Sequence, residues 1–431
     1  MQVKKTKVAG IIAEFNPFHN GHKRLIDYAK QNLHADHVII AMSGNFVQRG
    51  EPAITDKFTR AQMALSCGAD LVFEIPAVFA CAAAGDFARA GVALIDKTGI
   101  ADTLLFGIEG SCPLSFLREA SAILSAESGD FSDILNRGLK AGMSYPKARE
   151  AALHACLDPG GNATPMIRAL SSPNNILALE YLSALSERSA KLLPEALIRL
   201  GDGYHAQQPS DAAYTSATAL RGILQEINTA DSHSADRDAE RLLSPLSAYV
   251  PAELLPQYAE LLKKGLQFYP MHTDVLGAAL SSILLRHADD DFTRYADVSE
   301  EIGNRLRRGA ALLMGFDARI EQLWTKQYTR SRISRALLHI YLGITKDTVA
   351  AFKTQDYVPY LRLLGFSAHG QEILPLLKKH AQVPVLTKPA AAKELLAEDI
   401  RISNLYYSLL LANGSPVPNE YERGILHAKC M

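Results

Sequence analysis

The stretch VAGIIAEFNPFHNGHKRL, residues 8–25, decides the fold, because an apolar run passes through a short turn straight into a helix. We predict a strand over 8–15 and a helix over 21–33 from their apolar patterns. Further strands are predicted at 37–43, 71–75 and 103–107, with a fifth candidate at 194–200. Continuous apolar strands alternating with helices are typical of parallel sheets covered on both faces. The sequence therefore predicts an α/β fold with a Rossmann-like, doubly wound parallel sheet.

Helix starts and a change in pattern indicate how the chain is organised. Thr55 or Asp56 is expected to cap one helix, and Ser172 with Pro173 is expected to start another. From about residue 230 onward the periodicity is mostly helical, and few strand candidates remain. Polar loops are predicted at 201–214 and 230–245. We therefore expect a sheet-containing domain over 1–235 and a mainly α-helical domain over 236–431.

Composition excludes several classes of protein. With 45 Lys and Arg against 46 Asp and Glu, the formal net charge is −1, so any nucleic-acid-binding surface must be local. The five cysteines form no CxxC pair, which argues against a zinc knuckle or a disulfide framework and fits a reducing compartment. The longest apolar stretch is broken by Glu74 and Pro76 and is too short to span a bilayer. We expect a soluble cytoplasmic protein.

Two histidines flank a glycine where the first strand passes into the first helix. His19, Gly21 and His22 would lie at the carboxyl end of the sheet, where open α/β folds bind ligands. A helix N-terminus presents free N–H groups that suit phosphate, and a glycine lets a ligand come close. Two alternatives are ordinary surface histidines and a metal site, although two histidines alone are too few ligands.

The segment from Phe18 to His22 resembles the HxGH motif of the class I nucleotidyltransferase superfamily. That superfamily has a second signature at another helix start, and residues 215–221 are similar to it through Ser216, Thr218 and Arg221. The alternative for the second segment is an ordinary helix N-cap. The two segments together favour phosphate binding.

A larger part of the chain resembles the bacterial tRNA(Met) cytidine acetate ligases. The similar stretches include 10–22, 43–65, 106–110, 172–182, 198–205, 215–221, 295–306 and 328–340. The resemblance implies that ATP and acetate form acetyl-adenylate, and that the acetyl group passes to N4 of the wobble cytidine of elongator tRNA(Met). It assigns ATP binding and catalysis to 1–235 and tRNA binding to 236–431. It implies no membrane or protein partner.

The resemblance also assigns the candidate site residues. His19, His22 and Arg221 are expected catalytic residues, and Lys57 is a fourth, expected from its charge and its place after the second strand. Phe15 stands where many members have Tyr. Gly107, Asn174 and Arg199 match ATP-contacting positions, although a strand-ending glycine, a helix cap and a structural ion pair are the respective alternatives. The full expected ATP-binding set is Gly10, Ile11, Ile12, Ala13, Glu14, Phe15, Asn16, Pro17, Phe18, His19, Asn20, Gly21, His22, Gly107, Asn174, Arg199, Ser216 and Thr218.

Cationic side chains gather in two places. Arg49, Lys57 and Arg60 follow the second strand, where they suit acetate, pyrophosphate or tRNA, or form an ordinary charged helix start. Residues 305–335 hold eight Lys and Arg against two acids, with Trp324 and Tyr328 available to stack on bases. The alternative is a solvated helix face. The expected tRNA-binding residues are Arg49, Arg305, Arg308, Arg330, Arg332 and Arg335.

Two rival functions stay open at this stage. One is a small-molecule adenylyltransferase of the HxGH superfamily, against which the long helical C-terminal part argues. The other is a non-catalytic nucleotide- or RNA-binding relative, against which the two intact motifs argue. Magnesium would assist with the triphosphate, but no dedicated set of acidic ligands and no other metal site is predicted.

Overall fold

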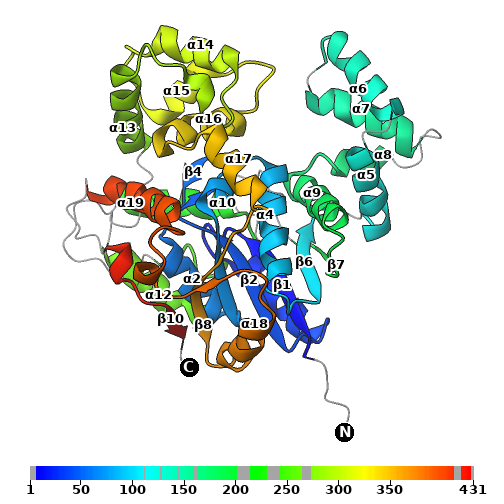
Figure 1. Ribbon diagram of the computed structural model, residues 1–431, viewed down its shortest axis with the longest axis vertical. Coiled ribbons are helices and arrows are strands. Elements are labelled where there is room, and N and C mark those ends of the chain that lie inside the picture. The colour runs from blue at the N-terminus through cyan, green and yellow to red at the C-terminus, as the bar shows by residue number, and fades with distance from the viewer. Residues whose placement is uncertain are drawn as a thin grey trace.

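The computed structural model describes residues 6–110, 112–126, 129–143, 145–158, 164–200, 214–230, 243–264, 273–411 and 419–428. A sheet runs through the body of the molecule, with helices on both of its faces (Figure 1). Most of the two predicted polar loops, at 201–213 and 231–242, lies outside the described residues. No helix in the described part is long and apolar enough to cross a membrane.

Five parallel strands form the centre of the sheet and confirm the predicted fold class. The order is β10-β8-β5-β2-β1-β6-β7, with β9 paired to β8. Val8 of β1 lies opposite His37 of β2, and Ala9 lies opposite Thr103 of β6. The parallel strands are β1 Val8–Ala13, β2 His37–Ser43, β5 Leu71–Ile75, β6 Thr103–Ile108 and β7 Leu193–Ile198.

Successive strand residues enter two separate cores, as expected for a sheet covered on both faces. Ile12 packs in the core that contains the side chains of α4 Ala84–Lys97 and α9 Pro173–Glu187. Ile11 packs in the other core, against α1 Asn20–Gln31, α2 Lys57–Ser66 and α10 Ala217–Ala230. The predicted helix starts are confirmed, because Asp56 caps α2 and Ser172 is the N-cap residue of α9, with Pro173 in its first turn.

The C-terminal part returns to the same sheet, which the sequence analysis did not foresee. Strand β8 Leu361–Ser367 pairs antiparallel with β5, and β10 Leu426–Ala428 pairs parallel with β8. Strand β9 Val385–Leu386 also pairs with β8. Their apolar runs are short and stand among helical stretches, so periodicity alone does not reveal them. The expected mainly helical segment 236–431 thus contributes three strands to the sheet of segment 1–235.

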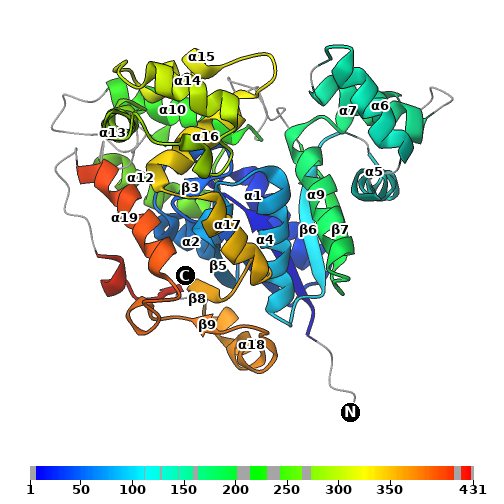
Figure 2. The same ribbon diagram turned by 45° about the horizontal axis from the view of Figure 1, so that its top comes forward.

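Two groups of helices stand beyond the carboxyl ends of the central strands, apart from each other (Figures 1 and 2). One group is α5 Leu114–Ala126, α6 Gly129–Lys140, α7 Tyr145–Leu157 and α8 Thr164–Ala169. The other is α13 Thr273–Arg286, α14 Glu300–Gly309, α15 Phe316–Leu323 and α16 Arg330–Leu342. The remaining main elements are β3 Phe46–Val47, β4 Glu51–Pro52, α3 Ala77–Ala80, α12 Leu255–Lys264, α17 Lys346–Thr354, α18 Leu374–His380 and α19 Ala397–Leu411.

Candidate active site

A cavity opens at the carboxyl ends of β1, β6 and β7, where the sequence placed the ligand. Most of the expected ATP-binding residues line it, together with Arg49, which was expected to contact tRNA. These lining residues are Ile12, Ala13, Glu14, Phe15, Asn16, His19, Gly21, His22, Arg49, Gly107, Asn174, Arg199 and Thr218.

Backbone hydrogen bonds fix the two histidines at the start of α1. His19 is the N-cap residue, and its Nδ1 accepts from the backbone N–H of Gly21 at 3.0 Å. The Nδ1 of His22 accepts from the backbone N–H of His19 at 3.2 Å. A neutral imidazole that accepts at Nδ1 carries its proton on Nε2. Each ring therefore keeps one N–H donor available for an oxygen atom in the cavity.

The electrostatics of the site keep both rings neutral in the absence of a ligand. Burial lowers the pKa of His19 to about 3, and the nearby Arg199 guanidinium acts in the same direction. Burial, His19 and Arg199 hold the pKa of His22 well below its ordinary value. The two rings stack with their centroids 3.7 Å apart, so two charged rings would repel each other strongly. Neutral donors with one nearby guanidinium suit the oxygens of a phosphate chain.

Gly21 has a steric reason to be glycine. A Cβ atom there would lie 2.8 Å from Cε1 of His19. Any other residue would displace the His19 ring from its place above the helix start. The glycine of the HxGH motif thus preserves the stacked pair of imidazoles.

Two polar side chains of the cavity wall, Asn174 and Arg199, form a hydrogen-bonded chain with Glu109. Nη1 of Arg199 donates to Oδ1 of Asn174 at 3.1 Å, and Nδ2 of Asn174 donates to Glu109. A Cβ atom on Gly107 would lie 3.3 Å from Cγ of Arg199, so this glycine gives the arginine stem room to cross β6. The arrangement holds the Arg199 guanidinium over the cavity.

The three residues of the second motif, Ser216, Thr218 and Arg221, make different contacts. Thr218 lines the cavity, whereas Oγ of Ser216 accepts from the N–H of Ala219 at 3.0 Å and caps α10. Arg221 is 8% exposed and does not line the cavity; its Nη1 donates to the backbone oxygen of Asn16 at 2.8 Å. Arg221 therefore braces the loop that carries HxGH, which differs from the direct phosphate contact expected from the sequence.

Six expected ATP-binding residues lie outside the cavity wall, and Ser216, which caps α10, is one of them. A Cβ atom on Gly10 would lie 2.4 Å from Cγ2 of Ile95, so Gly10 allows α4 to pack on the sheet. Asn20 donates from Nδ2 to the backbone oxygen of Ala248 at 2.9 Å. The cavity wall also does not include Ile11, Pro17 and Phe18. Ile11 and Phe18 belong to the hydrophobic core instead.

Lys57 is not in the cavity, contrary to its expected catalytic role. Its side chain is fully buried, and Nζ donates to the two carboxylate oxygens of Glu74 at 2.8 and 2.9 Å. It also pairs with Glu420, which pairs with Arg362 of β8. Its position at the start of α2 points it toward the β5–β8 pair rather than toward the ligand. We therefore assign Lys57 to the structure of the fold.

Several residues that line the cavity were not predicted as site residues from the sequence. Gln48, Tyr181 and Tyr214 line the cavity, and the backbone N–H of Gln48 donates to Oε1 of Glu14 at 2.8 Å. Burial raises the pKa of the Glu14 carboxyl. Gln48 follows the second predicted strand, so its place at the carboxyl edge was the available signal. No such signal marks Tyr181, which comes from the middle of α9.

Some of the expected tRNA-binding arginines are exposed, and others form hydrogen bonds or ion pairs within the protein. Arg308, Arg330 and Arg332 are exposed, although Arg330 pairs with Glu321 and Arg332 lies over the Tyr328 ring. Arg305 donates to the backbone oxygen of Gln322 at 2.8 Å. Arg335 is 8% exposed and its Nε lies 3.0 Å from Asp297. Arg335 is therefore a structural residue, contrary to its expected RNA contact.

Comparison with known proteins identifies the family. The model of the HIGH Nucleotidyl Transferase family matches residues 6–420. The chain is 34% identical over 420 residues to the tRNA(Met) cytidine acetate ligase of Lysinibacillus sphaericus, covering 96% of this chain and 98% of that protein. It is also 34% identical over 387 residues to that of Acetivibrio thermocellus, covering 89% and 88%.

Solved structures agree with this assignment. The structure of Thermotoga maritima TmcAL bound with alpha-thio ATP matches with a TM-score of 0.84 and 28% identity, over 98% of this chain and 100% of that chain. The apo form of that protein matches with a TM-score of 0.87 and 27% identity, over the same shares. With matches of this length to the family model and to its members, the chain belongs to the tRNA(Met) cytidine acetate ligase family, within the HIGH nucleotidyl transferases.

Proposed function

We propose that the protein is an ATP-dependent ligase that activates acetate as acetyl-adenylate and releases pyrophosphate. The acetyl group then passes to N4 of the wobble cytidine of elongator tRNA(Met), giving N4-acetylcytidine and AMP. The observation that carries this proposal is the pair of neutral imidazoles at the start of α1, each with an Nε2–H available to the cavity. The relatives' names and the ATP analogue of the Thermotoga protein support ATP and tRNA(Met) as substrates.

The first step is an in-line displacement at the α-phosphorus. A carboxylate oxygen of acetate attacks, and pyrophosphate leaves from the opposite side. His19, His22 and Arg199 would stabilise the charge that spreads over the phosphate oxygens, because they are fixed before the substrate arrives. Thr218 at the start of α10 also lines the cavity, and its hydroxyl offers a further donor.

The second step explains why the acid must be activated. The lone pair of the cytosine amine is delocalised into the ring, so it attacks only an acyl group with a good leaving group. AMP is such a leaving group. Arg49 lies in the cavity wall and would meet the incoming anticodon, while the exposed Arg308, Arg330 and Arg332 would contact the RNA backbone.

Exchange of labelled pyrophosphate into ATP tests the first step. The wild-type protein is expected to catalyse exchange that requires acetate. His22→Asn is the informative variant, because an Asn oxygen can still accept from the His19 N–H whereas the Nε2–H donor is lost. We expect exchange to fall by about 100-fold, the usual cost of one preorganised donor.

His380→Asn is the matched control, because His380 is exposed at the end of α18, away from the cavity. It should exchange at the wild-type rate. Exchange that does not need acetate, or a His22→Asn variant within about twofold of wild type, would contradict the proposed role of the site. Mass spectrometry of elongator tRNA(Met) after incubation with ATP and acetate tests the second step.

A further inference from the structure

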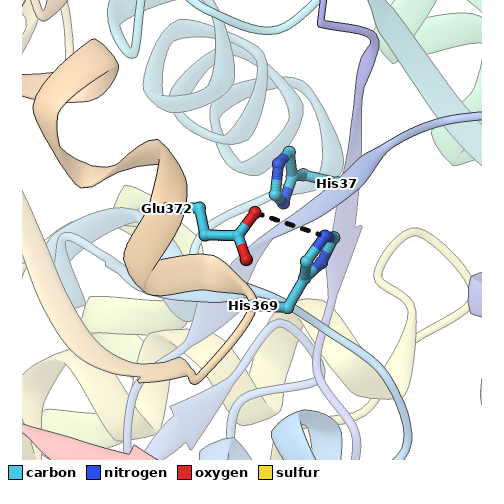
Figure 3. A group of neighbouring side chains, drawn as sticks. All are labelled: His37, His369 and Glu372. Carbon is cyan, nitrogen blue, oxygen red and sulfur yellow. Dashed lines mark ion pairs between the residues drawn. The ribbon is translucent and has the colours of Figure 1, made fainter.

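A second cluster of chemically active side chains lies at the other edge of the sheet from the ATP cavity. His37 is the first residue of β2, so it lies at the amino end of the parallel strands. His369 and Glu372 come from the segment after β8, which includes the 3₁₀ helix Gly370–Ile373. Figure 3 shows the three side chains turned toward one another across this edge. His37 is far from His369 and Glu372 in the sequence, so no local motif indicates the cluster.

The three residues offer a set of atoms suited to a transition metal. One ligand atom from each of His37, His369 and Glu372 lies within 4.8 Å of the others. Nε2 of His369 is 3.9 Å from Oε2 of Glu372, and the two imidazole rings stack with centroids 4.2 Å apart. Ligand atoms around a tetrahedral zinc ion are about 3.3 Å apart for bonds of about 2 Å. His369 and Glu372 are 47% and 69% exposed, which leaves them room to close that difference.

A buried carboxylate orients one of the rings. Asp70 is 1% exposed, and its Oδ1 lies 3.0 Å from Nδ1 of His369. The Ser367 hydroxyl and the Val38 N–H also donate to Asp70, and the Lys30 ammonium lies 3.3 Å away. With these donors Asp70 is saturated, so it acts on the ring and not on a metal. A ring that donates from Nδ1 to a carboxylate presents the Nε2 lone pair, as in many metal-bound histidines.

The other ring has an unsatisfied polar atom. His37 is 5% exposed, and its Nδ1 has no hydrogen-bond partner among the described residues. The nearest carboxylate oxygen, Oδ2 of Asp70, is 4.0 Å away. Buried polar atoms are nearly always paired, so one without a partner calls for a missing group. A metal ion held by the two rings and Glu372 would add a coordination bond to His37 and so restrain its ring.

We propose that His37, His369 and Glu372 bind one divalent transition-metal ion, with Zn²⁺ as the first candidate. Two imidazoles and one carboxylate are a common zinc set, and the exposed side of the cluster leaves a position for water. The ion joins β2 to the segment that follows β8. It therefore fastens the returning C-terminal strand to the central sheet and has a structural role, away from the ATP cavity.

The test measures metal binding by the full-length, tag-free protein after removal of metals with a chelator. Titration with ZnCl₂, followed by calorimetry and elemental analysis, should show one ion per chain. Saturating Zn²⁺ should raise Tm by about 3 °C at about 100 times Kd. His369→Gln and Glu372→Gln change exposed side chains, and each should weaken binding at least about tenfold.

His287→Gln is the matched control, since the His287 side chain is 43% exposed and pairs with an acid three residues later, Asp290, but belongs to no group of three metal-ligating side chains among the described residues. It should bind Zn²⁺ like wild type. No stoichiometric uptake at micromolar Zn²⁺, or unchanged binding in both His369→Gln and Glu372→Gln, overturns the proposal and leaves a metal-free ring stack. The readout uses no ATP, so its failure would not touch the ligase proposal.

Discussion

Replacing Lys57 with Met should destabilise the fold by about 3–5 kcal/mol, the usual cost of removing one partner from a buried ion pair. Lys57 and Glu420 are fully buried and Glu74 is 2% exposed, so water cannot take the place of the lost ammonium. Arg362 would then face both acids alone. Met keeps the length and apolar stem of Lys, so the loss reports the charge and not a cavity.

The effect should depend on pH with a defined sign. Burial alone would raise the pKa of the Glu420 carboxyl, but Lys57 and Arg362 hold it below its ordinary value. Without Lys57 burial dominates, and the folded-state pKa of an acid in the cluster rises above its unfolded value. Such a group binds a proton more readily in the folded state, so the variant regains stability as pH falls and loses it as pH rises.

Urea denaturation followed by circular dichroism measures this loss, with Lys353→Met as the control. Lys353 is 39% exposed and pairs with Asp86 at 2.8 Å, so its loss should cost less than about 1 kcal/mol. Pyrophosphate exchange is measured on the same samples under folding conditions. A Lys57→Met variant as stable as wild type but without exchange would refute the structural role and restore the catalytic one expected from the sequence.

Three further outcomes follow from the site and the basic surface. The folded-state pKa of His19 is about 3, below its unfolded value, so stability is lost as pH falls below about 6.5. Between pH 7.5 and 5.5 this group should cost about 1.4 kcal/mol in urea denaturation, a loss absent from His19→Asn. Gly21→Ala should lower exchange at least about tenfold, since its Cβ displaces the His19 ring; an unchanged rate contradicts this. The double variant Arg330→Gln, Arg332→Gln should bind tRNA more weakly in gel shifts, and the slope of log K against log salt concentration should fall in magnitude by about 2. Arg335→Gln should instead lower the free energy of unfolding.

Local sequence patterns predicted much of the fold. The predicted bounds of the strands at 37–43 and 71–75 are those of β2 and β5, because buried parallel strands are short, continuous apolar runs. The helix that begins at Pro173 was also marked locally, by Ser172 at its N-cap. Strand β8 was not marked by a local signal, because its seven residues stand among helical stretches and show no clear strand periodicity. Its place depends on pairing with β5, nearly 300 residues earlier, which only the folded chain shows.

The same distinction applies to the site. The HxGH segment is local, so the sequence placed His19 and His22 at the helix start and at the cavity. A count of charges could not distinguish Arg332 from Arg335, which lie three residues apart on α16. One lies over Tyr328 at the surface, and the other pairs with Asp297. Which face of a helix meets another element is a tertiary property, and this is also why the sequence does not show that Lys57 pairs with Glu74 outside the cavity.

The hairpin of β3 and β4 links the two predicted segments of the chain. It carries Gln48 and Arg49 into the wall of the ATP cavity. Its flanks are held by α19, because Nδ2 of Asn45 donates to Oγ of Ser403 at 2.8 Å and the Tyr406 hydroxyl donates to the backbone oxygen of Ala53 at 3.0 Å. The C-terminal part therefore shapes the cavity and does not hang from it as an appendage.

Helix α16 reaches the tip of the same hairpin. Oγ of Ser334 donates to the backbone oxygen of Gly50 at 2.8 Å. Gly50 has φ +84°, and a Cβ atom there would lie 2.4 Å from the backbone nitrogen of Arg335, so only glycine allows this approach. The exposed Arg330 and Arg332 stand on the first turn of that helix. The helix proposed to contact tRNA thus also holds the wall of the cavity proposed to form acetyl-adenylate. Ser334 follows Arg330 by about one helical turn, so RNA bound at the first turn of α16 would lie close to the contact that holds the hairpin carrying Arg49.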